Sequence, residues 1–168
     1  MDLSTARLLL HALTLDEARA LHAGRPLPGW TFAPGYPLPD TLDGLGLFLR
    51  HGVEEFGFYL IVRRDDSLVV GEIGFVGPPT DGVVTIGYAI VPDARRQGYA
   101  TEAIIALAGW ALAQPGVGEV RAQTLPDNEP SVRALLRAGF VESEPAEKAR
   151  RFAFYPGLSA TRSPPSSS

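Results

Sequence analysis

Residues 86–103 read IGYAIVPDARRQGYATEA, and they are the most informative stretch of the sequence. An apolar, strand-like run ends at Pro92, a short basic turn that contains a glycine follows, and a helix then begins. A turn that leads into a helix N-terminus aims several backbone N–H groups at one point, and such a point binds anions, phosphate above all. Gly98 has no Cβ, so an anion can approach the backbone closely, and Arg95 and Arg96 add charge-assisted donors. The structural alternative is a capped helix behind a solvated basic turn.

A second block, residues 128–140, reads NEPSVRALLRAGF and predicts another helix. Asn128 suits the N-cap position, and Pro130 falls in the first turn, where its missing N–H costs little. Val132 and Leu135 recur at helical spacing, which indicates a face directed at the core.

The remaining patterns place these two blocks in a mixed α+β domain. Strands are expected over residues 6–11, 56–64, 68–76, 83–91, 119–124, 140–143 and 149–155, and helices over residues 15–22, 40–51, 98–113 and 128–138. This order predicts an antiparallel sheet in the first half and a parallel crossover around residues 83–124. Residues 24–39 hold five prolines and three aromatic residues, so they predict a long loop that either binds a ligand or covers the core.

Length and charge narrow the class of protein. A chain of 168 residues suits one domain, expected over residues 1–157, with a disordered tail at residues 158–168. The net charge of −4 and the pI near 5.3 imply no broad basic surface, so we expect no nucleic-acid partner. The apolar runs are much shorter than the roughly 20 residues that cross a bilayer, and the N-terminus has no signal-peptide pattern. We therefore expect no membrane partner and a cytoplasmic location.

The content of cysteine and histidine limits the chemistry. The chain has no cysteine, which excludes a thiol nucleophile, a disulfide framework and a thiolate metal site. Its three histidines lie in the first third and form no zinc-binding pattern, so we expect no metal.

The segment Arg95-x-x-Gly98-x-Ala100 and the block at residues 128–140, together with the order of elements, resemble the GNAT superfamily of N-acetyltransferases. Within it, the chain is similar to the branch of the ribosomal-protein alanine N-acetyltransferases. The resemblance implies a mixed, mostly antiparallel sheet of six to seven strands flanked by helices. It also implies acetyl-CoA as the cosubstrate, bound by Ile90, Val91, Arg95, Arg96, Gln97, Gly98, Tyr99, Ala100, Thr101 and Asn128.

The resemblance further implies direct transfer of an acetyl group to a primary amine in a ternary complex. The acceptor is either a protein N-terminus or a small molecule, and the enzyme either a monomer or a homodimer. A backbone N–H near Ile90 or Val91 is the expected oxyanion donor. Ser131 is the candidate acid for the departing thiolate, with a purely structural capping role as the alternative.

Glu72 is the candidate general base, because it interrupts an otherwise apolar strand next to the one that precedes the basic turn. Burial would raise its pKa into a useful range. A position on the solvent side of that strand is the alternative. Two other classes also remain open: a non-catalytic acyl-CoA sensor on the same fold, and a phosphate-binding domain of another family.

Overall fold

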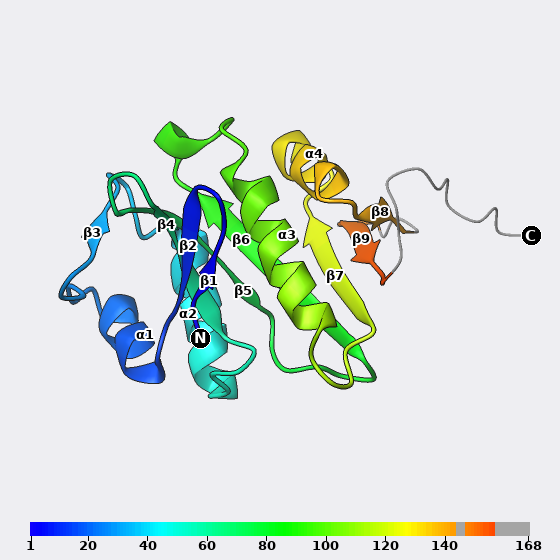
Figure 1. The fold of residues 1–168 in the computed structure, drawn as a ribbon, viewed down its shortest axis with the longest axis horizontal. Coiled ribbons are helices and arrows are strands. Elements are labelled where there is room, and N and C mark those ends of the chain that lie inside the picture. The colour runs from blue at the N-terminus through cyan, green and yellow to red at the C-terminus, as the bar shows by residue number, and fades with distance from the viewer. Residues whose placement is uncertain (144–146, 157–168) are drawn as a thin grey trace, which may run out of the picture.

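A mixed sheet forms the centre of the computed structural model, which describes residues 1–143 and 147–156 (Figure 1). Within these residues the strands are β1 (Leu3–Ser4), β2 (Leu8–Ala12), β3 (Thr31–Phe32), β4 (Phe58–Arg63), β5 (Leu68–Phe75), β6 (Val83–Ile90), β7 (Glu119–Thr124), β8 (Val141–Glu142) and β9 (Arg150–Phe154). The helices are α1 (Leu15–His22), α2 (Pro39–His51), the 3-10 turn η1 (Pro92–Ala94), α3 (Tyr99–Leu112) and α4 (Glu129–Arg137).

The strands are ordered β1-β2-β4-β5-β6-β7-β9-β8, and β3 pairs with β5 outside this path. Neighbouring strands along the path are antiparallel except for β6 and β7, which are parallel because α3 crosses over between them. The fold class expected from the sequence is therefore confirmed. The sheet gains two strands of two residues each, β1 and β3, beyond the seven that the sequence indicated.

The strand β3 lies inside the proline-rich segment, where a loop was expected. Thr31 and Phe32 pair in parallel with Leu68 and Val69, and the N–H of Ala33 donates to the carbonyl of Val69 at 2.9 Å. The register of β5 with β6 begins only at Gly71, so β3 occupies the edge that β6 leaves open. This pairing fixes the proline-rich segment to the sheet.

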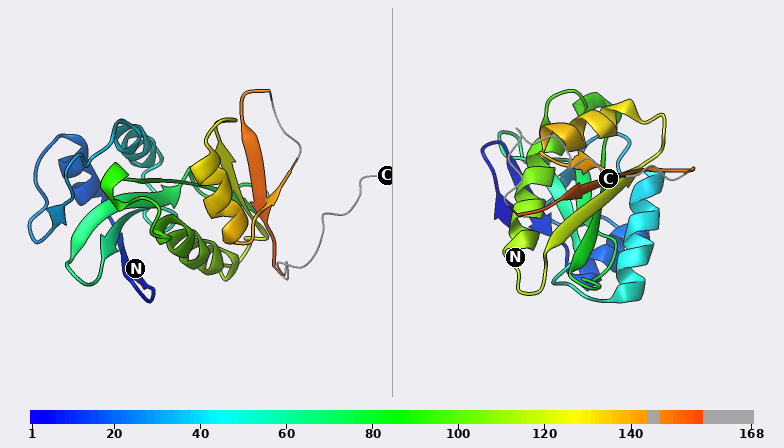
Figure 2. Two further views of the ribbon diagram at one scale, coloured as in Figure 1. Left: turned by 90° about the horizontal axis from the view of Figure 1, so that it is seen from above. Right: turned by 90° about the vertical axis from the view of Figure 1, so that its right-hand side faces the viewer.

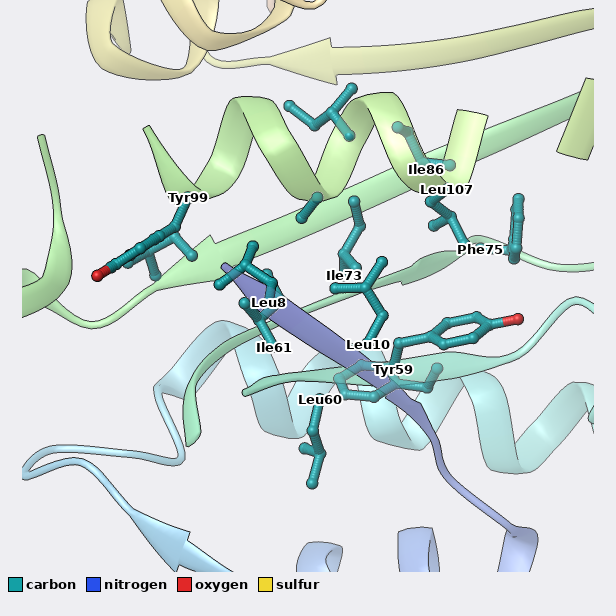
Figure 3. Packing of buried hydrophobic residues seen from close by; sticks show 14 of the residues in the cluster. Leu8, Leu10, Tyr59, Leu60, Ile61, Ile73, Phe75, Ile86, Tyr99 and Leu107 are labelled. Carbon is teal, nitrogen blue, oxygen red and sulfur yellow. The ribbon is translucent and has the colours of Figure 1, made fainter. Parts of the chain in front are cut away.

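Helices cover both faces of the sheet (Figure 2). Helix α3 lies on one face and α2 on the other, where it contacts β4, β5 and β6. Figure 3 shows Leu10, Ile73 and Leu107 gathered between the sheet and α3, whereas Leu60 points away from that helix. Alternation along the strands thus directs side chains into two apolar layers.

The predicted helix starts are confirmed at two positions. The hydroxyl of Thr14 accepts from the N–H of Glu17 at 3.2 Å, and the Glu17 carboxylate accepts from the N–H of Thr14, which together form a capping box. Asn128 caps α4 by accepting from the N–H of Ser131 at 3.4 Å. The expected tail at residues 158–168 lies outside the described residues. In the described part of the chain, helices that are long and apolar enough to cross a membrane are absent.

Candidate active site

The sheet opens between β6 and β7. Their parallel register covers only four residue pairs, from Val83 opposite Glu119 to Ile86 opposite Ala122. The end of β6 continues beside β5 to Ile90 without β7 as a partner. Backbone groups on that side of β6 are therefore available to a ligand that lies in the opening as an additional strand would.

The register of β5 with β6 identifies which backbone groups face the opening. The N–H of Val91 donates to the carbonyl of Val70 at 2.9 Å, so alternation turns the N–H groups of Tyr88 and Ile90 away from β5. Of the two positions expected to supply an oxyanion donor, Val91 is fully buried and its N–H is engaged with β5, so this N–H does not face the opening. The N–H of Ile90, by contrast, points away from β5 and toward the opening. Its carbonyl accepts from Nε of Arg95 at 2.9 Å.

Within the part of the chain that the structure describes, the turn before α3 presents backbone N–H groups without hydrogen-bond partners. Gly98 is the N-cap residue with φ of 80° and provides no side-chain cap, and the first helical bond runs from the N–H of Glu102 to the carbonyl of Gly98. The N–H groups of the first helical turn consequently lack intrahelical acceptors and lie at the positive end of the helix dipole. The preceding Arg95, Arg96 and Gln97 are exposed. This geometry is compatible with the expected pyrophosphate site.

A network that the sequence did not reveal holds this turn in place. Glu102 accepts hydrogen bonds from the hydroxyl of Thr5 at 2.5 Å, the backbone N–H of Arg7 at 2.8 Å and Nε of Arg7 at 2.7 Å. Nη1 of Arg7 also donates to the carbonyl of Gln97 at 2.7 Å. These contacts lower the pKa of Glu102 against the opposing effect of desolvation, which is the largest single influence. Glu102 therefore joins α3 to the β1–β2 loop, besides complementing the helix dipole.

Thr124 is a further residue that sequence reasoning missed. It ends β7 beside the opening, and its hydroxyl is buried without a hydrogen-bond partner among the described residues. Such a buried hydroxyl is rare in folded proteins unless a ligand or a water satisfies it. An arm that carries amide groups, such as the pantetheine of coenzyme A, fits this position and the free N–H groups of β6.

The helix α4 brings the second sequence block to the same opening. The hydroxyl of Tyr88 on β6 donates to the carbonyl of Ser131 at 3.1 Å, and burial raises the pKa of that tyrosine. The Oδ1 atom of Asn128 is used in the helix cap. The structure therefore places Ser131 beside Tyr88 of the unpaired part of β6, and Asn128 lies at the start of the same helix. The capping geometry agrees with a structural role for Asn128 and leaves its amide nitrogen for a ligand.

Glu72 lies on the face of the sheet opposite α3. The residue is 4% exposed, and its carboxylate accepts a hydrogen bond from Oγ1 of Thr41, which lies 2.9 Å from both carboxylate oxygens. The alternative of a solvent-side residue is thereby excluded. The pKa of Glu72 is raised to about 7, chiefly by burial; nearby Asp40 adds to the increase, and the hydroxyls of Thr41 and Tyr36 partly oppose it.

Tyr36 completes this buried cluster. Its hydroxyl lies close enough to Glu72 to influence the pKa of the carboxyl group, yet it has no hydrogen bond of acceptable geometry to any described residue. Burial, together with the negative charge of Glu72, raises the pKa of Tyr36 well above its ordinary range. Tyr36 comes from the proline-rich segment and Thr41 from the start of α2, so neither is a neighbour of Glu72 in the sequence.

Glu72 lines a cavity of about 220 Å³ between α2 and the ends of β5 and β6. Its other lining residues are Asp40, Gly44, Leu47, Phe58, Gly74, Phe75, Val76, Gly87, Tyr88 and Ala89. Ala89 pairs directly with Glu72, so this cavity and the β6–β7 opening lie next to the same segment of β6. A donor in the opening and an acceptor in the cavity would approach each other at the end of β6.

A larger hollow, about 390 Å³, lies by the start of α3 and contains Arg7, Arg63 and Arg64. Each of these arginines is already bonded, Arg7 to Glu102, Arg63 to Asp66, and Arg64 to the carbonyl of Thr5. The smaller cavity therefore has the better chemistry for catalysis, since it alone contains a buried carboxyl group with a raised pKa.

Comparison with known proteins identifies the family. Residues 7–141 match the sequence profile of the acetyltransferase (GNAT) domain. The chain belongs to the GNAT acetyltransferases. It is 36% identical over 144 residues to the uncharacterized N-acetyltransferase YoaA of Bacillus subtilis, covering 82% of this chain and 81% of that protein. The acetyltransferase is therefore an enzyme of the acyltransferase class, and the family transfers acetyl groups from acetyl-CoA.

Solved structures agree with this fold. The ribosomal-protein-S5-alanine acetyltransferase from Vibrio fischeri superposes with a TM-score of 0.66 at 13% identity, covering 95% of this acetyltransferase and 99% of that chain. RimL, a ribosomal L7/L12 α-N-protein acetyltransferase solved with coenzyme A, superposes with a TM-score of 0.66 at 18% identity, with coverage of 92% and 98%. At such identities the likeness shows the shared fold.

Proposed function

We propose that this acetyltransferase moves an acetyl group directly from acetyl-CoA to a primary amine, in a ternary complex. The new C–N bond forms as the thioester C–S bond breaks, and the amine loses a proton to Glu72, directly or through a water. Acetyl-CoA supplies the activated acyl group. The chain itself has to align the two reactants, stabilise the oxyanion and accept the proton.

Each of these tasks has a candidate group near the end of β6. The N–H of Ile90 points toward the β6–β7 opening and is the proposed oxyanion donor. The free N–H groups at Gly98 and in the first turn of α3 would bind the pyrophosphate, with Arg95, Arg96, Gln97, Tyr99, Ala100 and Thr101 in the same segment. Asn128 would contact the pantetheine arm, and the hydroxyl of Ser131 would donate a hydrogen bond to the departing thiolate.

The proposal depends on Glu72, a buried carboxyl group with a raised pKa in the wall of the cavity. A carboxyl group with a pKa of about 7 is half ionised near neutral pH, which matches the requirement for a general base that must accept and then release a proton. Its cavity adjoins the segment of β6 that faces the opening. A non-catalytic acyl-CoA sensor is less favoured, because the relatives of this chain are named N-acetyltransferases.

The test is release of free coenzyme A from acetyl-CoA in the presence of a panel of amines and short peptides. The chain contains no cysteine, so a thiol reagent detects only the product. We expect Glu72→Gln to lower kcat by about 10²- to 10⁴-fold while acetyl-CoA still binds. Glu55→Gln, the same substitution at an exposed position outside the cavity, is the matched control. Full activity of Glu72→Gln, or no amine that accelerates release by the wild type, would refute the proposal.

A further inference from the structure

One wall of the cavity beside Glu72 lacks side chains. Gly74 of β5 and Gly87 of β6 pair directly across the two strands, and both line the cavity. A Cβ atom at Gly74 would lie 3.0 Å from the carbonyl oxygen of Gly57, so packing accounts for the absence of a side chain there.

Packing does not account for Gly87. The residue is exposed, and a Cβ atom built on it would meet no atom within 4 Å. Its backbone conformation is that of a regular strand, in which glycine is disfavoured relative to most residues. The free space above Gly87 belongs to the cavity, so a side chain there would occupy volume that an acceptor molecule otherwise fills.

The charges around the cavity point to a cation. Asp40 at the rim and Glu72 at the base are its charged lining residues, and no arginine, lysine or histidine of the described chain lines it. An ammonium group is attracted to both carboxylates, whereas a carboxylate on the acceptor would be repelled by them. The other walls are largely apolar, with Leu47, Phe58 and Phe75 among them. A volume of about 220 Å³ is below the range typical of drug-sized ligands, which indicates a compact group.

We propose that the acceptor is a primary amine with a compact apolar substituent and no adjacent carboxylate, and that the absence of a side chain at Gly87 sets the largest substituent admitted. This inference rests on the proposed function, because it names the acceptor class of the same cavity. An amine of this kind occurs at a peptide N-terminus and in small alkylamines, and amino-acid amides reproduce its chemistry.

The size limit is tested with L-alaninamide and L-leucinamide as acceptors for the wild type, Gly87→Ala and Gly87→Val. We expect Gly87→Val to lower kcat/KM for leucinamide relative to alaninamide by at least about tenfold. The same ratio for Gly87→Ala should lie between those of the wild type and Gly87→Val. Thr85→Val changes the same strand two residues earlier, outside the cavity lining, and should leave the ratio unchanged. The acetyl-CoA dissociation constant should stay within about twofold in all variants.

An equal loss for both amides, or an unchanged ratio in Gly87→Val, overturns the size limit. Binding of the two amides to the coenzyme A complex, followed by ligand-observed NMR, separates this inference from the proposed function. If the wild type binds both amides without acetylating them, the proposed function fails. Selective loss of leucinamide binding in Gly87→Val then still supports the role of Gly87, and equal binding refutes it.

The charge preference is tested by the ratio of kcat/KM for L-alaninamide to that for L-alanine. The amine of the amide is less basic than that of the free amino acid, so the wild-type ratio by itself mixes basicity with recognition. The difference in basicity is the same for the wild type and Asp40→Asn, because both act on the same two compounds. A change in the ratio between the two proteins therefore reports recognition alone. We expect the preference for the amide to fall severalfold in Asp40→Asn. An unchanged ratio would refute the charge contribution of the cavity rim.

Discussion

Replacing Glu72 by glutamine should make the protein more stable at alkaline pH. The carboxyl group has a pKa of about 7 in the folded protein, against its ordinary value of 4.5 in an unfolded chain. A carboxyl group with a raised pKa holds its proton more tightly when folded. Its contribution to the free energy of unfolding is therefore fully present below pH 4.5 and is lost as the pH rises through 7.

The magnitude follows from the two pKa values. Each unit of pKa corresponds to about 1.4 kcal/mol, so the increase from 4.5 to about 7 costs about 3 kcal/mol of folding free energy once Glu72 is ionised. Glutamine is neutral at every pH and can still accept a hydrogen bond from Thr41. Between pH 5 and 8, Glu72→Gln should therefore gain about 2 kcal/mol relative to the wild type.

The assay is urea unfolding of both proteins at several pH values, with thermal melts in parallel. For a chain of this length, about 2 kcal/mol corresponds to a relative increase in Tm of about 4–8 °C. Glu55→Gln should follow the wild type, because Glu55 is exposed. If the stability difference between Glu72→Gln and the wild type is the same at pH 5 and pH 8, Glu72 does not have the raised pKa on which the base assignment depends.

Three other substitutions probe the same region. In Gly71→Ala, the new Cβ would lie 2.1 Å from the carbonyl oxygen of Ala89, so we expect a loss of about 1–3 kcal/mol by urea unfolding, together with a lower kcat because the end of β6 must move. Gly98→Ala forces φ of 80° on a residue with a Cβ, which costs about 1 kcal/mol. This substitution should raise the dissociation constant of coenzyme A, measured by calorimetry, by about tenfold. An unchanged affinity would mean that the turn does not hold the pyrophosphate. Tyr36→Phe removes the hydroxyl whose position beside Glu72 lowers the pKa of that carboxyl group, so the apparent pKa in the kcat/KM profile should increase. A profile that shifts to lower pH would contradict the position of Tyr36 beside Glu72.

The turn before α3, the start of α4 and the strands β5 and β6 were predictable because the sequence patterns that specify them are local. The glycine turn before α3, the N-cap at Asn128 and the strand periodicity of β5 and β6 each depend on a few consecutive residues. The family resemblance uses the same short segments. Glu72 was identifiable because a charged residue in an apolar strand is conspicuous in the sequence itself.

The surroundings of Glu72 were not predictable, since they depend on contacts between distant parts of the chain. Thr41 reaches Glu72 across 31 residues, and Arg7 reaches Glu102 across 95. Prolines in residues 24–39 argued for a loop, which concealed both the pairing of β3 with β5 and the inward position of Tyr36. The choice between Ile90 and Val91 likewise required the strand register, because adjacent residues in a strand direct their N–H groups to opposite sides.

The limited register between β6 and β7 has a mechanical consequence. Four residue pairs, with α3 packed across them, connect the unit of β7, β9 and β8 to the rest of the sheet. A molecule that bonds to both edges of the opening would therefore add contacts between the two parts of the sheet. Hydrogen exchange should then slow in β7 and β9 when coenzyme A is added, far beyond the residues that touch it. The donor would thus act as a structural component of the sheet as well as a reactant.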